Sequence, residues 1–579
     1  MPQLSDHTHR SDIEEHIAAV SGEHRNGGLA VMAALAAHGT EVIFGIPGTH
    51  NLELYRHMAP LGIAAITPRH EQGAGYAADG YHQVTGRPGV VITTSGPALT
   101  NALTAAATAY AESRPMILIS PGMPLGTEGK DLGLLHETKD SSGSVDRLLA
   151  WSRRVRTPEA AAHAVTQAFE EFSRGRPRPV HIEVPLDVLE AQWSGQVPTP
   201  ALPSSPAPGQ AVLKQAAELL AQADSPLIIA GGGSRGAVGP LRRLAESLGA
   251  PVATTSNGKG VLAEDHPLSL GANVRRAVVQ EASYAADVLL VIGSELGDSD
   301  LWGGLIGSEH GPDAEKAEQT VIRIDIDPSQ LHKNLHGDVL ICADAQEALG
   351  GVLASLEEIG NAEISIAQEG GRTVTEAAAE RAAELRRRID KEFDPAGMLP
   401  SLTTLVQRAA GEDVIIAGDS SQVTYDGTIH ALVARQLGQL LYMPGYATLG
   451  YGIPAAIGAK IAAPERPVVA LVGDGAAMFS LQEIMTAVEC ELPVVFLVVD
   501  NGGYKEIEAQ MDERSIPHVG VRLVRPDFAA LGAAMGTHAV SLSGTAADNP
   551  AAPWREQLEA AVREAVAAEK PTVISLQLP

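Results

Sequence analysis

Two polar turns in the last third of the chain carry residues suited to bind a metal ion and a diphosphate. Gly473-Asp474-Gly475 follows the apolar run Val468–Val472, and Asn501-Gly502-Gly503 follows the apolar run Val494–Val499. If both runs are parallel strands, the turns lie at the carboxyl edge of the sheet, where α/β sheets bind ligands. Mg²⁺ takes hard oxygen donors and is commonly shared between a diphosphate and one or two protein groups. We therefore predict Asp474, Asn501 and the main-chain carbonyl of Gly503 as metal ligands.

The glycines in these turns would let the backbone approach phosphate oxygens. Because they lack a Cβ atom, Gly473, Gly475 and Gly502 can offer N–H donors where a side chain would obstruct. A single Gly-Asp-Gly turn is common at strand ends and indicates little by itself. The second polar turn, 27 positions after the first, makes the pattern far more specific.

Glu71 lies in the segment Thr67–Tyr81, in the first third of the chain. A strand is predicted to end near Pro68, and a helix rich in small residues is predicted to begin at Glu71. An isolated Glu at such a junction is usually a first-turn acid favoured by the helix dipole. The surrounding sequence favours a functional role for Glu71, because Arg-His-Glu-Gln is followed by Ala-Asp-Gly-Tyr.

Together these segments resemble the thiamine-diphosphate enzymes. The two polar turns match the Gly-Asp-Gly…Asn-Asn signature of that family, with Asp500 in place of the first Asn. The Glu71 segment resembles the catalytic-Glu segment of the acetohydroxyacid synthase and 2-oxo-acid decarboxylase superfamily, and Phe44–Gly48 and Thr94–Pro97 match its flanking loops. The resemblance extends from about Gly28 to the C-terminus.

The resemblance implies thiamine diphosphate bound through Mg²⁺. Glu71 would contact the pyrimidine ring and promote loss of the C2 proton, which in water is too weakly acidic to leave at neutral pH. Leu449 would support the V-shaped cofactor, and the Ala447 carbonyl, where Gly is more usual, would accept from its 4′-amino group. The family motifs assign further cofactor contacts to Gly48, Ser420, Ser421, Gln422, Gly473, Gly475, Ala476 and Tyr504.

The resemblance also implies an oligomer. In the family, the Glu-bearing domain of one subunit meets the diphosphate-binding domain of another. We therefore expect a homodimer or homotetramer with active sites at the subunit interface.

Short β-branched runs alternate with Ala-rich helical segments along the chain, a pattern typical of parallel sheets covered by helices on both faces. We predict an α/β fold of three doubly wound parallel-sheet domains after a mobile tail at residues 1–24. The pyrimidine-binding domain would span 25–192, the central domain 205–358 and the diphosphate-binding domain 390–579, with a Pro-rich linker at Trp193–Gln210. Further strands are predicted at Val42–Phe44, Val90–Thr93, Met116–Ile119, Val180–Val184, Leu227–Ala230, Val288–Ile292, Val321–Ile326 and Val414–Ala417.

The composition narrows the class of protein. A formal net charge of −28 argues against a nucleic-acid surface, which needs clustered Lys and Arg. The two cysteines, Cys342 and Cys490, are too few for a disulfide framework or a zinc cluster and suit a reducing compartment. No apolar run approaches the ~20 residues that span a bilayer. We expect a soluble, cytoplasmic enzyme that acts on a small-molecule 2-oxo acid.

Three features of the acetohydroxyacid synthases are missing. Gly293–Asp300 stands where they carry Arg-Phe-Asp-Asp-Arg beside FAD, and Pro185-Leu-Asp187 stands where they carry Pro-Lys-Asp. Gln510 takes the place of the Trp that shapes their second-substrate pocket. These departures weaken the case for bound FAD and for branched-chain synthesis.

Glu506 and Ile507 occupy positions where the synthases show apolar pocket residues. A carboxylate facing an apolar substrate would be poorly compensated, whereas a guanidinium or ammonium tail would pair with it. With Leu132–His136 and Arg176–Asp187, this pattern resembles the 5-guanidino-2-oxopentanoate decarboxylase branch. We predict decarboxylation of a 2-oxo acid with a basic tail, and we place His50 and Glu295 among the further substrate contacts.

Other functions stay open at this point. Acetolactate synthase-type carboligation of pyruvate is one alternative, and a pyruvate-oxidase-like flavoenzyme using Gly231-Gly-Gly and Asp325-Ile-Asp327 for FAD is another. A catalytically silent homologue should lack the activating carboxyl group, so Glu71 argues against it. Candidate proton donors are His50, His70 and His136, although a structural imidazole is the commoner role.

Overall fold

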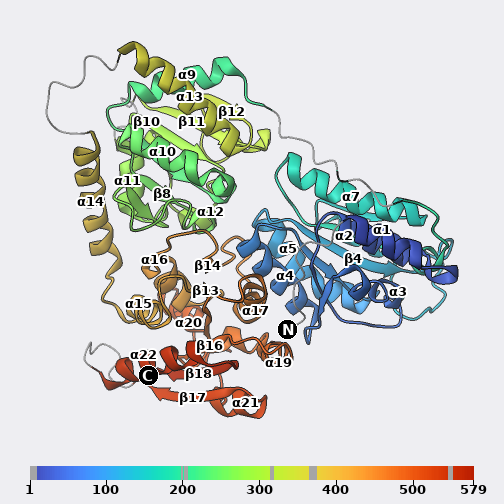
Figure 1. Cartoon of the computed structure of the whole chain (residues 1–579). Helices are drawn as coiled ribbons and strands as arrows, with labels where there is room; N and C mark the ends of the chain where they lie inside the picture. The colour runs from blue at the N-terminus through green and yellow to red at the C-terminus, as the bar shows by residue number, and fades with distance from the viewer. Residues whose placement is uncertain are drawn as a thin grey trace.

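The computed structural model describes residues 10–196, 200, 207–312, 318–363, 374–544 and 552–578. These residues form three six-stranded sheets, one after another along the chain (Figure 1). Neighbouring strands in each sheet are parallel. Helices precede and follow the strands in each domain. The predicted α/β fold of three parallel-sheet domains is confirmed.

The first sheet has the strand order β2-β1-β3-β4-β6-β5. Phe44 and Val91 belong to one hydrophobic cluster, and their neighbours Ile43 and Val90 belong to another. Since successive strand residues point to opposite faces, this sheet is covered on both sides. Its elements are α2 (Gly27–Ala37), β1 (Val42–Gly45), α3 (Leu52–Tyr55), β2 (Ala64–Ile66), α4 (Glu71–Thr85), β3 (Gly89–Ile92), α5 (Pro97–Ala111), β4 (Met116–Gly122), α6 (Ser141–Asp146), β5 (Trp151–Arg154), α7 (Pro158–Arg174), β6 (Val180–Pro185) and α8 (Leu186–Glu190).

The central sheet has the order β12-β11-β10-β7-β8-β9. Helix α14 packs on this domain through Ala382 and Ile389 and ends at Phe393, so the predicted start of the third domain at position 390 lies in its last turn. The elements are α9 (Gln210–Ala221), β7 (Leu227–Ala230), α10 (Val238–Leu248), β8 (Val252–Thr254), β9 (Ser269–Gly271), α11 (Ala277–Ala285), β10 (Val288–Ile292), α12 (Asp298–Leu301), β11 (Thr320–Asp325), β12 (Val339–Cys342), α13 (Ala345–Glu363) and α14 (Val374–Phe393).

The third sheet has the order β14-β13-β15-β16-β18-β17, which places β15 and β16 side by side. Their carboxyl ends carry the two polar turns that the sequence predicts as a metal site. The elements are α15 (Met398–Ala410), β13 (Ile415–Ala417), the π-helix η8 (Val423–Thr428), α16 (Ile429–Ala431), β14 (Leu440–Leu441), α17 (Gly452–Ala462), β15 (Val468–Gly473), α18 (Asp474–Ala477), α19 (Ile484–Glu489), β16 (Val495–Asp500), α20 (Lys505–Glu513), α21 (Phe528–Ala534), β17 (His538–Ser543), α22 (Pro553–Ala567) and β18 (Thr572–Gln577).

The N-terminal segment corrects one expectation. Residues 1–9 lie outside the described part of the chain, but Arg10–Ala19 form the helix α1. Ile13 and Ile17, one turn apart on the helix, are buried against the first domain. The expected mobile tail is therefore wrong for this helix, because two apolar residues four apart suffice to anchor an otherwise polar segment. Residues 197–199 and 201–206 of the predicted linker Trp193–Gln210 also lie outside the described residues.

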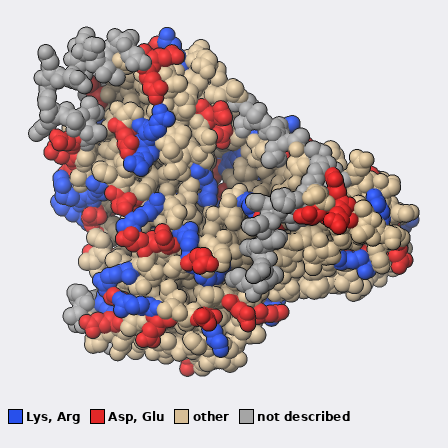
Figure 2. Space-filling view, viewed as in Figure 1, with Lys and Arg blue, Asp and Glu red and all other residues tan. Residues whose placement is uncertain are grey.

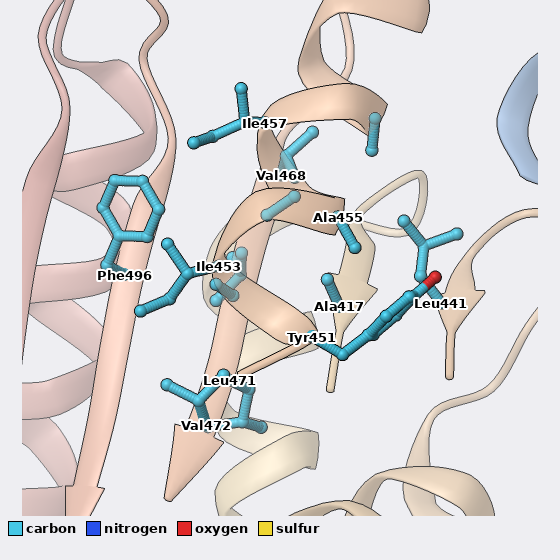
Figure 3. Close-up of a cluster of buried hydrophobic side chains, with 14 of the residues drawn as sticks. Ala417, Leu441, Tyr451, Ile453, Ala455, Ile457, Val468, Leu471, Val472 and Phe496 are labelled. Carbon is cyan, nitrogen blue, oxygen red and sulfur yellow. The ribbon is translucent and has the colours of Figure 1, made fainter. Parts of the chain in front are cut away.

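Helices α4 and α17 join the first domain to the third. In the close-up of Figure 3, Ile453 and Ile457 of α17 lie on the same side as Phe496 of β16. Tyr451, at the start of α17, points toward Leu441 (Figure 3). Both helices belong to one continuous hydrophobic cluster, so the two domains share a core.

A buried ionic junction reinforces this contact. The carboxylate of Asp79 on α4 accepts hydrogen bonds from the Arg114 guanidinium at 2.7 Å, from the Gln83 amide at 2.9 Å and from the Tyr451 hydroxyl. Arg114 also donates to the Asn257 carboxamide of the central domain at 2.7 Å. Asp79 and Arg114 are both buried, and their junction contacts all three domains.

Close packing of α4 on α17 generates a stability prediction. A Cβ atom at Gly458 would overlap the carbonyl oxygen of Ala77 on α4. We expect Gly458→Ala to destabilise the protein by about 2 kcal/mol or more, although Ala favours a helix, because neither backbone can yield. Thermal unfolding should show a lower midpoint.

Gly350→Ala is the matched control, because Gly350 lies within α13 and a Cβ atom there has open space around it. It should leave the midpoint unchanged or raise it slightly. Equal effects of the two substitutions would contradict the packing argument.

Candidate active site

Three oxygen atoms converge at the carboxyl ends of β15 and β16. Asp474 begins α18 directly after β15, and Asn501 follows β16. The side-chain amide of Asn501 lies 3.2 Å from Asp474 Oδ1 and 3.2 Å from the carbonyl oxygen of Gly503. In the structure the amide oxygen of Asn501 faces these two acceptors, so the amide makes no hydrogen bond to either of them. In the opposite orientation the amide nitrogen would donate to both.

This donor set fits a magnesium ion. Acceptor oxygens repel one another unless a proton or a cation lies between them, and a carboxylate, a carboxamide and a carbonyl are hard donors of the kind Mg²⁺ takes. The structure thus brings the three predicted ligands together. Within the described residues no cluster of three or more His, Cys, Asp or Glu side chains forms an alternative metal site.

The geometry of the second turn explains why it requires glycine. Gly503 has φ +135°, and a Cβ atom there would overlap the carbonyl oxygen of Val521. The Tyr504 N–H donates to that carbonyl at 2.9 Å, and the Leu523 N–H donates to Gly502 at 3.1 Å. This short pairing fixes the turn. It also places the Tyr504 ring against Gly475, where a Cβ atom would lie 2.7 Å from the ring.

Asp500, the one departure from the family signature, has its own partner. The side chain is fully buried, and its Oδ1 accepts from the Gly502 N–H at 3.1 Å and lies 3.3 Å from Nε of Arg525. Burial and the adjacent Asp500 raise the pKa of the Asp474 carboxyl above its usual range. Arg525 therefore supplies a positive charge beside two carboxylates. Sequence spacing gave no signal for this pair.

The Gly418–Gln422 loop lies next to the first polar turn. The Ser421 hydroxyl donates to Asp419 Oδ1 at 2.6 Å, and a Cβ atom at Gly473 would lie 3.0 Å from Cβ of Ser421. Burial raises the pKa of Asp419 to about 7, and its Oδ2 has no hydrogen-bond partner among the described residues. Ser420, Ser421 and Gln422 follow this buried carboxyl group, which sequence reasoning did not single out.

The 445–454 segment carries Ala447 and Leu449. Ala447 has φ +49°, a left-handed conformation that favours glycine and explains why Gly is more usual at this position. The segment is held by the first domain at two points. The Glu112 carboxylate accepts from the Gly445 N–H at 2.6 Å, and the Tyr76 hydroxyl lies 2.7 Å from the Thr448 hydroxyl. Leu449 is half-buried.

Glu71 begins α4, as the sequence predicts. The helix is capped by His70, whose side chain accepts from the Gln72 N–H, so His70 has a structural role. The Glu71 carboxylate accepts from the Asn101 amide at 2.9 Å near the surface, and Glu71 itself is half-buried. Gly48 lies in the same domain, against Thr94.

Two further histidines meet at a serine in this domain. Nδ1 of His50 lies 2.6 Å from the Ser95 hydroxyl, and Nδ1 of His136 lies 3.4 Å from it. The two rings are 5.5 Å apart. Burial and the neighbouring His136 lower the pKa of His50, which favours its neutral form at pH 7.

Glu506 faces the Gly418–Gln422 loop. It accepts from the Gln422 amide at 3.2 Å and from the Gln510 amide at 2.9 Å, while Ile507 beside it is exposed. Both of these hydrogen-bond donors are neutral amides. In the described residues no Lys or Arg nitrogen lies within ion-pairing distance of Glu506.

Glu295 lies in a different environment from Glu506. It pairs with Arg176 at 3.1 Å and with Lys333 at 2.7 Å. Glu295 and Arg176 border a cavity of about 780 Å³ between the domains, which is also lined by Gly232 and Asp325 from the segments considered for FAD. The two ion pairs give Glu295 a structural role that needs no contact with the substrate.

Glu71 and the three predicted metal ligands lie in different domains of the chain. Glu71 accepts from Asn101 in the first domain, whereas the Asn501 side chain lies 3.2 Å from Asp474 Oδ1 in the third. Among the described residues no hydrogen bond joins Glu71 to these ligands.

Comparison with known proteins agrees with this geometry. Residues 25–143 match the thiamine pyrophosphate enzyme N-terminal TPP binding domain, residues 213–352 the central domain and residues 422–576 the C-terminal TPP binding domain. The chain belongs to the thiamine pyrophosphate enzyme family. It is accordingly an enzyme of this family, with domains that bind thiamine diphosphate.

Two kinds of relative are similar over most of the chain. The probable 2-ketoarginine decarboxylase AruI of Pseudomonas aeruginosa is 38% identical over 515 residues, which cover 88% of each chain. A probable acetolactate synthase large subunit of Methanocaldococcus jannaschii is 34% identical, covering 82% of this chain and 80% of its own. The acetolactate synthase large subunit of Parasynechococcus marenigrum is 31% identical, covering 96% and 87%.

Surface features are compatible with a small-molecule enzyme. On the face in Figure 2, acidic and basic side chains are interspersed and form no continuous basic patch. Among the helices of the described residues, none has the length and apolar character that a membrane span requires.

The Asp500–Arg525 pair generates a prediction about metal binding. Arg525→Met would leave Asp500 buried beside Asp474 without a compensating cation, and breaking such a pair is destabilising. Since Arg525 is partly exposed, we expect a loss of about 1–3 kcal/mol in the metal-free protein. Thermal unfolding should show that added Mg²⁺ restores part of the loss.

The double substitution Asp500→Asn with Arg525→Met is the control, because it removes both charges and recreates the Asn-Asn signature. It should recover most of the stability of the native protein. A double variant as unstable as Arg525→Met would show that the ion pair is not the cause.

Proposed function

We propose that this protein is a thiamine-diphosphate- and Mg²⁺-dependent decarboxylase of a 2-oxo acid with a basic tail, such as 5-guanidino-2-oxopentanoate. The observation that carries the proposal is the Glu506 carboxylate beside the Gly418–Gln422 loop. It accepts from two amides and has no Lys or Arg partner among the residues that the structure describes. The 38% identity to a probable 2-ketoarginine decarboxylase supports the same substrate class.

The cofactor would be held from two sides. Asp474, Asn501 and the Gly503 carbonyl would bind Mg²⁺, and Ser420, Ser421 and Gln422 with Gly473, Gly475, Ala476 and Tyr504 would surround the diphosphate. Thiamine diphosphate, when bound, supplies the carbon nucleophile and accepts the electrons released with carbon dioxide. Glu71 would hold a proton at the pyrimidine ring, with Gly48 beside it and Leu449 and Ala447 supporting the ring system.

A second copy of the chain would complete the site. Glu71 and its partner Asn101 lie near the surface in one chain, whereas a carboxyl group acts on the pyrimidine most effectively away from water. Exposed apolar side chains adjoin cofactor-binding segments of the third domain: Tyr446 precedes Ala447, and Met478 and Phe479 follow α18. We propose a homodimer or homotetramer that pairs Glu71 of one copy with the metal site of another.

The His50–Ser95–His136 group would supply the proton that completes decarboxylation. Release of an aldehyde requires a proton at the carbon that has lost carbon dioxide. The Ser95 hydroxyl between the two imidazoles can pass a proton from one ring to the other. His50 would contact the substrate, and His136 would restore its proton.

Acetolactate synthesis is the second candidate, favoured by the identity to acetolactate synthase subunits. Gln510 argues against it, because its amide donates to Glu506 at 2.9 Å instead of providing an aromatic wall for a second oxo acid. Product analysis with pyruvate or with 5-guanidino-2-oxopentanoate separates the two reactions. Acetolactate from pyruvate as the sole product would refute the proposed decarboxylation. A flavoenzyme would instead purify yellow.

Removal of the Glu71 carboxylate tests the reaction class. We expect Glu71→Gln to lower kcat by about 100-fold or more, because a positioned acid–base group contributes on that scale. Binding of thiamine diphosphate, measured by calorimetry with Mg²⁺ present, should change little. Full turnover in this variant would contradict the assigned role.

Neutralisation of Glu506 tests the substrate class. We expect Glu506→Gln to lower kcat/KM for 5-guanidino-2-oxopentanoate by about 10- to 100-fold, since a charge-assisted hydrogen bond contributes about 1.5–3 kcal/mol. Glu513→Gln removes an exposed carboxylate from the same helix α20 and should have no such effect. Equal losses in both variants would point to a general charge effect.

A further inference from the structure

An exposed tryptophan follows the short helix α12. Trp302 is 57% exposed, and its φ of +54° places it in the left-handed region that a bulky residue rarely adopts. The main-chain N–H of Trp302 donates to the Asp298 carbonyl at 2.7 Å. The helix ends with this hydrogen bond. Large exposed aromatic groups in strained backbone are costly and are concentrated at binding sites.

The Trp302 ring lies beside an aromatic residue of the third domain. Its centroid is 5.8 Å from the ring of Tyr425, and the two planes are inclined by 38°. The Arg275 guanidinium carbon lies 4.8 Å from the Trp302 centroid. The ring is thus already in a cation–π contact with a guanidinium group, which shows that its surroundings accept one.

Two carboxylates act on the same tyrosine. Burial, together with the carboxylates of Glu506 and Asp426, raises the pKa of the Tyr425 hydroxyl. Partial desolvation and Glu506 raise the pKa of Asp426, while Arg276 and Arg275 oppose that shift. Asp426 is therefore partly compensated by this chain's own arginines, whereas Glu506 has neutral partners.

The position of Tyr425 ties this group to the proposed cofactor loop. Gln422 donates to Glu506 and directly precedes the π-helix η8, which contains Tyr425 and Asp426. Single π-turns are frequent at functional sites. One helical turn thus separates the diphosphate-binding residues from the aromatic pair, so that a substrate reacting at the cofactor could place its tail here.

We propose that Trp302 and Tyr425, with Glu506 and Asp426, form the binding site for a planar guanidinium tail of the substrate. This inference rests on the proposed function and names the residues that select the tail. The guanidinium would stack against the aromatic rings while its N–H groups donate to Glu506. Burial lowers the pKa of the Arg275 guanidinium, and Tyr442, Asp300 and Asp426 oppose that shift.

The chemistry of the site selects guanidinium over ammonium. A guanidinium group is planar and weakly hydrated, so it stacks on an aromatic face and donates in its own plane to a carboxylate. An ammonium group is a compact, strongly hydrated charge that gains less from a flat aromatic wall. The enzyme should therefore prefer 5-guanidino-2-oxopentanoate to 6-amino-2-oxohexanoate.

Substitution of Trp302 tests the site. We expect Trp302→Leu to lower kcat/KM for 5-guanidino-2-oxopentanoate by about 10-fold, the effect of losing a partly desolvated cation–π contact. The kcat/KM for 2-oxohexanoate, which has an uncharged tail, should change less than about 2-fold. Trp302→Phe should retain most of the selectivity because it keeps an aromatic face.

Leu305→Ala is the control, because Leu305 is 50% exposed and lies three residues from Trp302. It should leave the ratio of the two substrates unchanged. Equal losses on both substrates in Trp302→Leu would overturn the proposed site, as would unchanged selectivity.

A binding measurement separates this inference from the proposed function. Calorimetry with 4-guanidinobutanoate and the cofactor-loaded protein should detect binding that Trp302→Leu weakens about 10-fold. Retained decarboxylation with Trp302-independent binding would overturn only the tail site. No turnover of any 2-oxo acid, with Trp302-dependent binding of this probe, would overturn the decarboxylase assignment and support the tail site.

Discussion

The buried ion pair between Asp79 and Arg114 is the contact on which the arrangement of the three domains depends. Asp79 lies in the middle of α4, and α4 packs so closely on α17 that Gly458 has no room for a side chain. Arg114 also contacts the carbonyl of Tyr442 and the side chain of Asn257. A buried guanidinium needs such a full set of acceptors, because an unpaired charge there would be strongly unfavourable.

This junction also positions the segment that is predicted to contact the cofactor. Glu112, two residues before Arg114, accepts from Gly445 and from Asn257, and burial raises the pKa of its carboxyl group. Gly445 begins the segment with Ala447 and Leu449. The left-handed Ala447 and the half-buried Leu449 are thus held by a polar network that extends through the first and central domains, and not by their own local sequence.

The predicted metal-binding turn Asn501–Gly503 follows a residue that departs from the family signature, yet the predicted ligands still lie together. Asp500 adds a carboxylate where the signature has a carboxamide, and Arg525, 25 positions later in the chain, lies against it. Arg525 can neutralise the extra negative charge because it follows the segment that pairs with Gly502 and Gly503. The three oxygens of Asp474, Asn501 and Gly503 still converge.

The sequence by itself determined the fold class, the order of the domains and the residues of the two polar turns. Strand periods and glycine turns are local properties, so Val468–Val472 and the turn after it could be predicted directly. Strands β5, β8, β9, β12 and β14 were not predicted, since strands of two to four residues carry little periodic signal. The six-residue strands β17 and β18 were also not predicted. The α1 helix was missed because only two buried isoleucines anchor it.

Only the tertiary structure decided which distant side chains meet. Arg525 at Asp500, Gln422 at Glu506 and Trp302 at Tyr425 are each separated by at least 25 positions or lie in different domains. Their contacts depend on long-range packing, and no local pattern records it. Glu71 was identifiable from its motif, whereas the close packing of its helix α4 on α17 could not be predicted from either segment alone.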